Sequence, residues 1–210
     1  PLTGILKADV TTKFDMQSVE KSQYENIRNA GSMSLSDFKY ADENGKTMNI
    51  SKALIQFNPS QVNLKQFDAT TGKSDLSVTG ILENFYGFIF KNQELKGNFN
   101  LNSNQLDVSD FMTTAEAGNT DTKTEAMKIP AFLNASLTAK ANTVLYDNLT
   151  LKDVSGKLIV KDEKLTMENI KTSIFDGVIG LNGAVSTKEK VPTFNMDLSL
   201  KQVDIAKSFT

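Results

Sequence analysis

The strongest constraint on the fold of this chain is that its sequence repeats. Residues 53–80 align with residues 156–183 without a gap, at an offset of 103. The coinciding apolar pairs are Ile55 and Leu158, Phe57 and Val160, Val62 and Leu165, Leu64 and Met167, Leu76 and Ile179, and Val78 and Leu181. Each copy must therefore present the same face to the same kind of surroundings, so one structural unit is expected twice.

Beyond Gly80 and Gly183 the offset falls to 97, and copy one carries six additional residues. At this offset Phe99 falls on Met196 and Leu101 on Leu198. The additional length coincides with the most aromatic stretch of the chain, namely Phe85, Tyr86, Phe88, Ile89 and Phe90. Two readings stay open for this stretch: strand residues inside a core, or a cover that folds over an apolar face with Gly87 permitting the bend.

Apolar and polar residues alternate in both copies, most clearly in the run Phe194, Met196, Leu198 and Leu200. A period of two indicates strands with one apolar face, and closely spaced turn residues separate them. The sequence predicts an all-β protein with a minor helix: an elongated, curved antiparallel meander of two tandem repeats, shaped like a groove. A β-sandwich or an open barrel is the alternative. The helix is expected over Gln17 to Ala30, ended by Gly31.

A step of apolar residue, Asp and apolar residue closes each copy, at Asp107 and again at Asp204. A third instance surrounds Asp15, and these Asp residues are expected to cap or turn the chain out of the last strand. Residues 1–16 are therefore interpreted as the tail of a preceding unit and the chain as a piece of a longer protein. The expected organisation is unit one at 17–112, a polar, flexible linker at 113–130 and unit two at 131–210.

Composition argues against catalysis. The chain contains no His and no Cys, which removes the usual general base, the common nucleophile pairs and thiolate or imidazole metal sites. Basic and acidic residues number 23 and 25, so no concentrated positive surface is expected for nucleic acid. We expect no enzyme activity, no cofactor and no metal. The triplet Gly72-Lys73-Ser74 imitates a phosphate-binding loop, and residues 42–45 imitate part of a calcium loop, but β-turns explain both better.

The repeat resembles the C-terminal modules of the AsmA-like family of bacterial envelope proteins. Copy two carries the resemblance in Leu165-Thr166-Met167, the turn Phe175-Asp176-Gly177, the glycine-ended segment Ile179 to Gly183, and Pro192 through Asp204-Ile205. Asp176 stands where the family pattern has a glycine, and copy one replaces that turn altogether. The resemblance implies a periplasmic protein that is anchored in the inner membrane outside this segment, and a curved sheet whose apolar lining carries lipid acyl chains.

The leading hypothesis is therefore a non-enzymatic segment that binds or conducts lipid, or another apolar ligand, in outer-membrane biogenesis. The expected groove residues are Ile55, Phe57, Val62, Leu64, Leu76, Val78, Phe99, Leu101, Leu158, Val160, Leu165, Met167, Ile179, Leu181, Met196 and Leu198. The expected groove cover is Phe85, Tyr86, Phe88, Ile89 and Phe90. The alternative is a structural or protein-interaction module of the cell envelope that binds envelope proteins through its strand edges.

Overall fold

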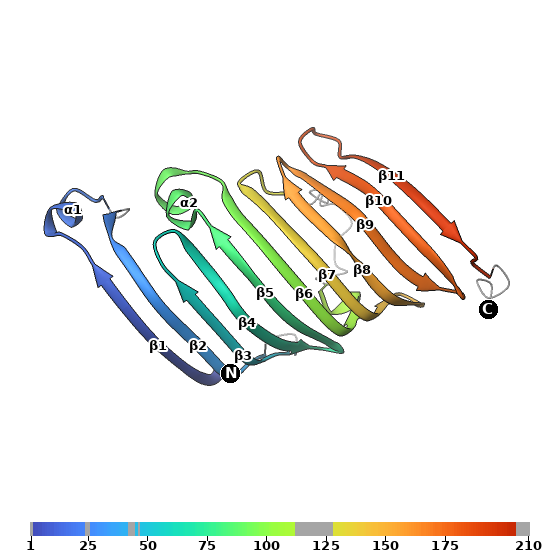
Figure 1. The fold of residues 1–210 in the computed structure, drawn as a ribbon, viewed down its shortest axis with the longest axis horizontal. Helices are drawn as coiled ribbons and strands as arrows, with labels where there is room; N and C mark the ends of the chain where they lie inside the picture. Colours follow the sequence, from blue (N-terminus) through green and yellow to red (C-terminus); the bar gives the residue numbers. More distant parts are fainter. Residues whose placement is uncertain (1, 24–25, 42–44, 46, 112–127, 205–210) are drawn as a thin grey trace, which may run out of the picture.

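The chain folds into one open β-sheet. The computed structural model describes residues 2–23, 26–41, 45, 47–111 and 128–204. Its eleven strands follow each other in sequence order across the sheet, and two short helices lie at the same end of it (Figure 1). The predicted all-β meander is confirmed, and the sheet is open, so neither a sandwich nor a barrel forms.

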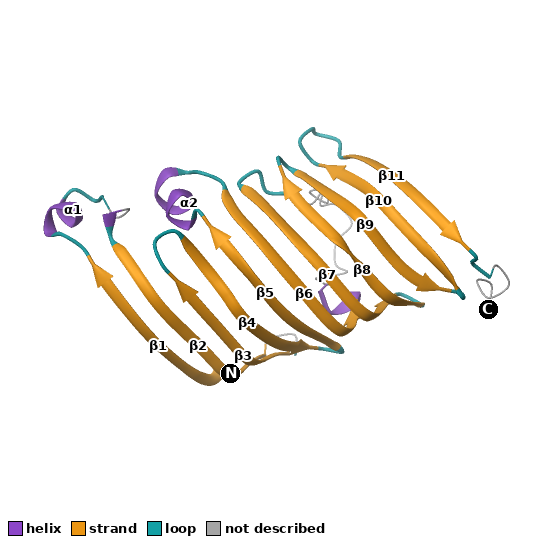
Figure 2. Ribbon diagram, in the orientation of Figure 1, coloured by secondary structure: helices purple, strands orange, loops and turns teal. Residues whose placement is uncertain are grey.

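The strands are long and the connections between most of them are short, as Figure 2 shows. In the first part of the chain the elements are β1 (Leu2–Lys13), α1 (Met16–Glu20), β2 (Arg28–Ala41), β3 (Thr47–Phe57), β4 (Gln61–Thr71), β5 (Ser74–Glu83), α2 (Phe85–Lys91), β6 (Leu95–Asp107) and the 3-10 turn η2 (Val108–Phe111). The remaining strands are β7 (Leu133–Tyr146), β8 (Leu149–Lys161), β9 (Lys164–Ile174), β10 (Gly177–Ser186) and β11 (Thr193–Lys201).

The sequence repeat corresponds to a repeat of strands. Strand β4 becomes β9, and β5 becomes β10, when 103 is added to their first and last residue numbers. Strand β6 and strand β11 occupy equivalent places after them. The order of strands from β2 to β6 is thus repeated from β7 to β11.

The junction between β6 and β7 differs from every other strand pairing in the described sheet. These two strands run parallel, with Leu95 opposite Leu133, whereas the other neighbours are antiparallel. A parallel pairing requires the chain to cross back to the starting end of the sheet. Most of the linker predicted at 113–130 lies outside the described residues. The assignment of residues 1–16 to a preceding unit stays a prediction, and β1 pairs antiparallel with β2.

The helix predicted for Gln17 to Ala30 is wrong over most of its length. Helix α1 ends at Glu20, and strand β2 begins at Arg28, so Gly31 lies inside a strand instead of ending a helix. The predicted segment has few apolar residues with which a longer helix could pack. Most of β2 instead finds backbone partners in both β1 and β3. The capping role predicted for Asp15 is confirmed, because its carboxylate accepts from Ser18 N at 2.7 Å.

Local irregularities interrupt the long strands, but the apolar side chains on either side of each irregularity stay on the same face. The backbone of Asp37, Asp153 and Asn169 has positive φ, at 51°, 52° and 52°. Asp and Asn tolerate this left-handed conformation better than most other residues, and an extra residue at a bulge restores the alternation of faces. The register shifts between Lys152 and Ser155 accordingly accompany Asp153.

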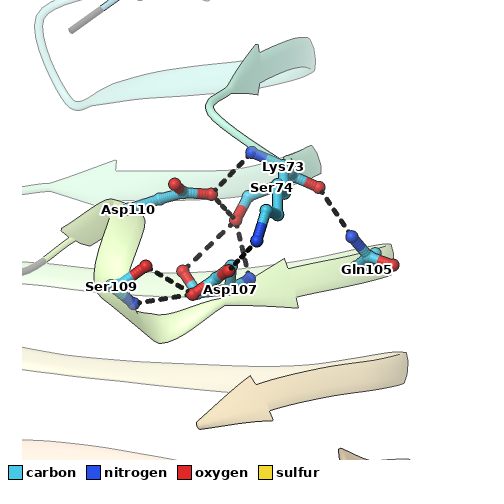
Figure 3. A network of polar contacts seen from close by, with 6 residues as sticks. All are labelled: Lys73, Ser74, Gln105, Asp107, Ser109 and Asp110. Carbon is cyan, nitrogen blue, oxygen red and sulfur yellow. Dashed lines mark hydrogen bonds and ion pairs between the residues drawn. The ribbon is translucent and has the colours of Figure 1, made fainter. Parts of the chain in front are cut away.

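A network of polar contacts fixes the hairpin turn between β4 and β5 to the end of β6 (Figure 3). The carboxylate of Asp110 accepts from Lys73 N at 2.9 Å and from Ser74 Oγ at 2.7 Å. Ser74 Oγ in turn accepts from Asp107 N at 2.8 Å, and Lys73 Nζ lies 3.5 Å from Asp107 Oδ2. The predicted turn at Gly72-Lys73-Ser74 therefore holds an anion, and that anion is a carboxylate of the same chain.

Copy two makes an equivalent attachment with different atoms. Gly177 occupies the place of Ser74 and has no hydroxyl, and Asp204 N donates to Phe175 O at 2.8 Å. In both copies the backbone N–H of the closing Asp is thus bound to the preceding hairpin turn. The apolar-Asp-apolar step marks the place where the last strand of a unit is joined to that turn.

Asp75 provides a pH-dependent test of this end of the sheet. Burial alone would raise its pKa, but the N–H groups of Asn104 and Gln105 outweigh burial and hold the pKa below 3.8. A carboxyl group with a lowered pKa adds stability above its unfolded pKa, and that stability is lost as the pH falls through the folded pKa. We expect Asp75→Asn to destabilise the protein by about 1 kcal/mol at pH 7.

The measurement is urea unfolding of wild type and Asp75→Asn between pH 7 and pH 2. The difference between the two proteins should shrink below a pH of 3.8, the ordinary value for an Asp carboxyl group. Asp197→Asn serves as the control, because that carboxylate is exposed on β11. An equal destabilisation by Asp75→Asn at every pH would contradict the assignment of this stability to the ionised carboxylate.

Candidate apolar binding face

One face of the sheet is apolar from the first strand to the last. Residues that pair directly across neighbouring strands share a face, so the strand register defines rows of side chains that cross the sheet. The row nearest the α2 end is Val10, Gly31, Phe57, Val62, Leu82, Gly97, Ala135, Val160, Leu165, Val185 and Phe194. The next row is Ala8, Met33, Ile55, Leu64, Gly80, Phe99, Leu137, Leu158, Met167, Gly183 and Met196.

Neither of these two rows contains a polar or charged side chain. We call the side of the sheet that bears them the apolar face. Shorter rows continue it toward the other end, through pairs such as Val78 with Leu101 and Leu181 with Leu198. An extended surface without a single charge in its two complete rows suits an occupant that is itself uncharged along its length.

All of the predicted groove residues lie on the apolar face. Ten of them belong to the two complete rows. Leu76, Val78, Leu101, Ile179, Leu181 and Leu198 belong to the shorter rows. Sequence reasoning missed the contributions of β1, β2 and β7, such as Met33 and Leu137, although the alternating segment from Leu133 to Ala139 carried the same signal.

The opposite face is mostly polar. A row of the same length crosses it through Asp9, Ser32, Gln56, Asn63, Ile81, Asn98, Ser136, Ile159, Thr166, Ala184 and Asn195. A hollow of about 600 Å³ lies on this side of β1 to β4, and Asp9, Gln56 and Asn63 are among its lining residues. The contrast between the faces indicates that one side meets water and the other side meets something apolar.

The described residues supply no second layer over the apolar face. Among them, the hydrophobic residues that are fully buried are mostly small, such as Ala53 and Ala69 around Ile50. Larger side chains of the central strands are half-buried, because they shield one another within the single layer. Exposure is greatest on the terminal strands, where Leu6 of β1 is 61% exposed and Leu198 of β11 is 62% exposed.

Glycines in the apolar face leave space above the backbone, and large side chains from the neighbouring residues fill that space. A Cβ atom at Gly80 would overlap the ring of Phe99, and one at Gly97 would lie 2.7 Å from the far side of the same ring. Gly183 has Met196 in the equivalent position in copy two, at 3.1 Å from such a Cβ. Phe99 and Met196 therefore lie along the sheet, which produces a smoother apolar surface than upright side chains would.

The aromatic stretch of copy one forms helix α2, so its interpretation as core strand residues is wrong. The helix lies in the connection between β5 and β6 at one end of the sheet (Figure 1). Tyr86 Oη accepts a hydrogen bond from Asn29 Nδ2 of β2 at 3.0 Å. On its other side Phe88 packs against Phe132, just before β7, with ring centroids 5.1 Å apart. Helix α2 therefore reaches from β2 to β7.

This span places α2 over the ends of several strands. Three strand spacings, about 14 Å on a flat sheet, separate β2 from β5, so the contact with Asn29 brings the helix back over β3 and β4. Asn29 lies two residues from Gly31 in the same strand, on the apolar face. The helix is thus on the side of the sheet where the predicted cover would lie.

The bend predicted at Gly87 occurs elsewhere. Gly87 is inside the helix, and the chain turns at Asn84 and Asn92, which have positive φ of 60° and 51°. Asn84 Nδ2 donates to Glu94 O at 2.8 Å and closes the base of the segment. At Gly87 a Cβ would overlap the side-chain amide oxygens of Asn84 and Gln93, so these two side chains occupy the space that the glycine leaves.

The site offers apolar contact area and little else of chemical use. The described residues contain no cluster of three His, Cys, Asp or Glu side chains that could hold a metal ion. In the same part of the chain, no helix has both the length and the apolar character needed to cross a bilayer. The neighbouring carboxylates of Asp107 and Asp110 already accept hydrogen bonds from the turn between β4 and β5 and from η2.

Comparison with known proteins finds no relative. No family model matches the chain, no curated protein matches its sequence, and no solved structure matches its fold. The class of the protein therefore follows from its own architecture: a single-layer, repeated β-sheet with one apolar face, whose two complete rows carry no charge.

Proposed function

We propose that this chain is a non-enzymatic segment of a bacterial envelope protein that binds or conducts lipid acyl chains along its apolar face. The observation that carries the proposal is the pair of complete rows that cross eleven strands without a polar side chain. Acyl chains are flexible, uncharged and long, so they can lie along such a surface and shield it from water. The proposal explains why one face of the sheet is apolar, and it requires no covalent bond to be made or broken.

The resemblance to the AsmA-like family supports the cellular setting within this proposal. It implies a periplasmic chain that is part of a protein anchored in the inner membrane elsewhere in its sequence and active in outer-membrane biogenesis. Helix α2 then serves as the cover of one end of the apolar face. Its exposed Phe85 and Ile89 provide apolar surface that a bound chain can meet.

A second function is favoured by the strand edges. Strands β1 and β11 each have one side without a neighbour in the described sheet, and unpaired strand edges recruit further strands. In this alternative the chain is an interaction module that binds envelope proteins by strand addition. The apolar face would then be covered by protein.

Native mass spectrometry of gently purified protein distinguishes the two functions. We expect a series of masses in which the protein carries phospholipid, and displacement of that lipid by an excess of the fluorescent fatty acid cis-parinaric acid. Bare protein that fails to bind cis-parinaric acid, together with a co-purifying protein that covers β1 or β11, would favour the interaction module.

A further inference from the structure

Several connections at the α2 end of the sheet expose large apolar side chains, whereas the hairpins between β3 and β4 and between β8 and β9 contribute none. The strand register places these connections at one end, since Lys13 pairs with Arg28, Glu83 with Lys96, Leu95 with Leu133, and Ser186 with Thr193. Figure 2 shows α1, α2 and the loop between β10 and β11 along this end. The exposed apolar residues there are Phe14, Met16, Phe85, Ile89, Phe90, Phe132 and Val191.

These side chains come from separate connections and are not needed to fill a core. Val191 is 74% exposed in the last connection, Met16 is 63% exposed in the first, and Ile89 is 50% exposed on α2. Loops that face water are normally polar, and single exposed apolar residues are common but are not usually gathered in several connections at the same end. Their repetition along one end indicates a partner that is apolar at its surface.

The charges at the two ends differ in sign. Basic side chains at the α2 end are Lys13, Lys21, Arg28, Lys91, Lys96, Lys128, Lys161, Lys164, Lys188 and Lys190. The acidic side chains described at the same end are fewer, namely Asp15, Glu20, Glu83, Glu94, Asp162, Glu163 and Glu189. At the other end the carboxylates of Asp107, Asp110, Asp147, Asp176 and Asp204 outnumber the basic side chains of Lys73 and Lys201.

Part of the acidic charge at the α2 end is already engaged within the chain. Asp15 accepts from Ser18 N and from Ser18 Oγ, both at 2.7 Å, and Glu163 lies 3.2 Å from Lys128 Nζ. The remaining lysines surround the exposed apolar residues: Lys91 ends α2, and Lys188 and Lys190 precede Val191. Apolar side chains flanked by lysines suit the interface of a bilayer with anionic headgroups.

We propose that the α2 end of the sheet docks on the surface of an anionic lipid bilayer. The apolar side chains enter the boundary between headgroups and acyl chains, and the lysines meet the phosphates. The first complete row of the apolar face runs alongside this end, and the pair Leu95 and Leu133 continues the apolar face from that row to the end, so an acyl chain could pass there between bilayer and sheet. This inference extends the proposed lipid binding, but the docking itself can be tested separately.

The test is flotation with vesicles of phosphatidylcholine and phosphatidylglycerol at a ratio of about 7 to 3, compared with pure phosphatidylcholine. Wild-type protein should partition onto the anionic vesicles at least about tenfold more strongly, with the difference shrinking in high salt. The variant Phe85→Ser/Ile89→Ser/Val191→Ser should lose about tenfold or more of that partitioning. Phe111→Ser is the matched control, because Phe111 is 50% exposed like Ile89 but lies at the opposite end.

Two further variants keep the inference testable. If the triple variant fails to fold by circular dichroism, Lys188→Glu/Lys190→Glu in the exposed loop should weaken flotation on anionic vesicles by about tenfold without altering the strands. A charge on the apolar face, Met167→Glu, should abolish binding of cis-parinaric acid while leaving flotation intact, which separates docking from ligand binding. Flotation that survives both end variants, or that Phe111→Ser reduces equally, overturns the proposal.

Discussion

Gly183→Val is expected to destabilise the protein severely, whereas Gly180→Val in the same strand is expected to cost little. A Cβ atom at Gly183 would lie 2.6 Å from the carbonyl oxygen of Asn195 and 3.1 Å from Met196 Cγ. At Gly180 the nearest atom is Ser199 Cβ, at 3.8 Å, which is ordinary van der Waals contact. Because a backbone carbonyl cannot rotate away, β10 and β11 must separate, at a cost of about 3 kcal/mol.

The repeat makes a second form of the same prediction. Gly80 occupies the equivalent place in copy one, where a Cβ would lie 2.6 Å from the carbonyl oxygen of Asn98 and overlap Phe99. Gly80→Val should therefore be about as damaging as Gly183→Val. Chemical denaturation of the three variants measures the effects. If Gly180→Val were as unstable as Gly183→Val, valine would be poorly tolerated anywhere in these strands. The close approach of the backbone at Gly183 would then not explain the loss of stability.

Met167→Glu is expected to abolish binding of an acyl chain while leaving the fold largely intact. Met167 lies in a complete row of the apolar face between Leu158 and Gly183, and its side chain is half-buried. A carboxylate can remain hydrated on this open sheet when no ligand is present, but a bound acyl chain would have to exclude that water. The penalty of a few kcal/mol corresponds to a loss of affinity of about a hundredfold.

The adjacent residue provides the matched control for this variant. Thr166 precedes Met167 in β9 and lies in the row of the polar face, between Ile159 and Ala184. Thr166→Glu should bind cis-parinaric acid as wild type does, within about a factor of two. Cooperative unfolding of Met167→Glu at much lower denaturant than Thr166→Glu would instead show that the apolar face is a dry core, and the proposed lipid surface would be wrong.

The sequence was informative wherever burial on one face dictated the residue type. Alternation at Leu165 and Met167, or at Phe194 and Met196, predicted both the strands and the face that their side chains share. The gap-free repeat added the pairing of equivalent strands, because loops and strands of the same length fell on each other. These features depend on local patterns, which a single sequence carries directly.

Features that depend on interactions between distant parts of the chain could not be predicted in the same way. The parallel pairing of β6 with β7 results from a crossover. The alternation of apolar and polar residues is the same in parallel and antiparallel strands, so it does not predict the direction of this pairing. The helical form of residues 85–91 was missed because consecutive apolar residues give no clear period, and the contact between Tyr86 and Asn29 joins segments far apart in sequence. The turn at Gly72-Lys73-Ser74 was predicted, but its partner Asp110 was not.

The most direct test of the apolar face compares two neighbouring positions in one strand. Leu158 lies in a complete row of the apolar face, and Ile159 lies in the row of the polar face. A photoreactive phenylalanine analogue placed at either position, in protein produced in bacteria, reports what each face touches. We expect lipid adducts at position 158 and none at position 159. Protein adducts at position 158, or equal lipid labelling at both positions, would contradict a lipid-binding apolar face.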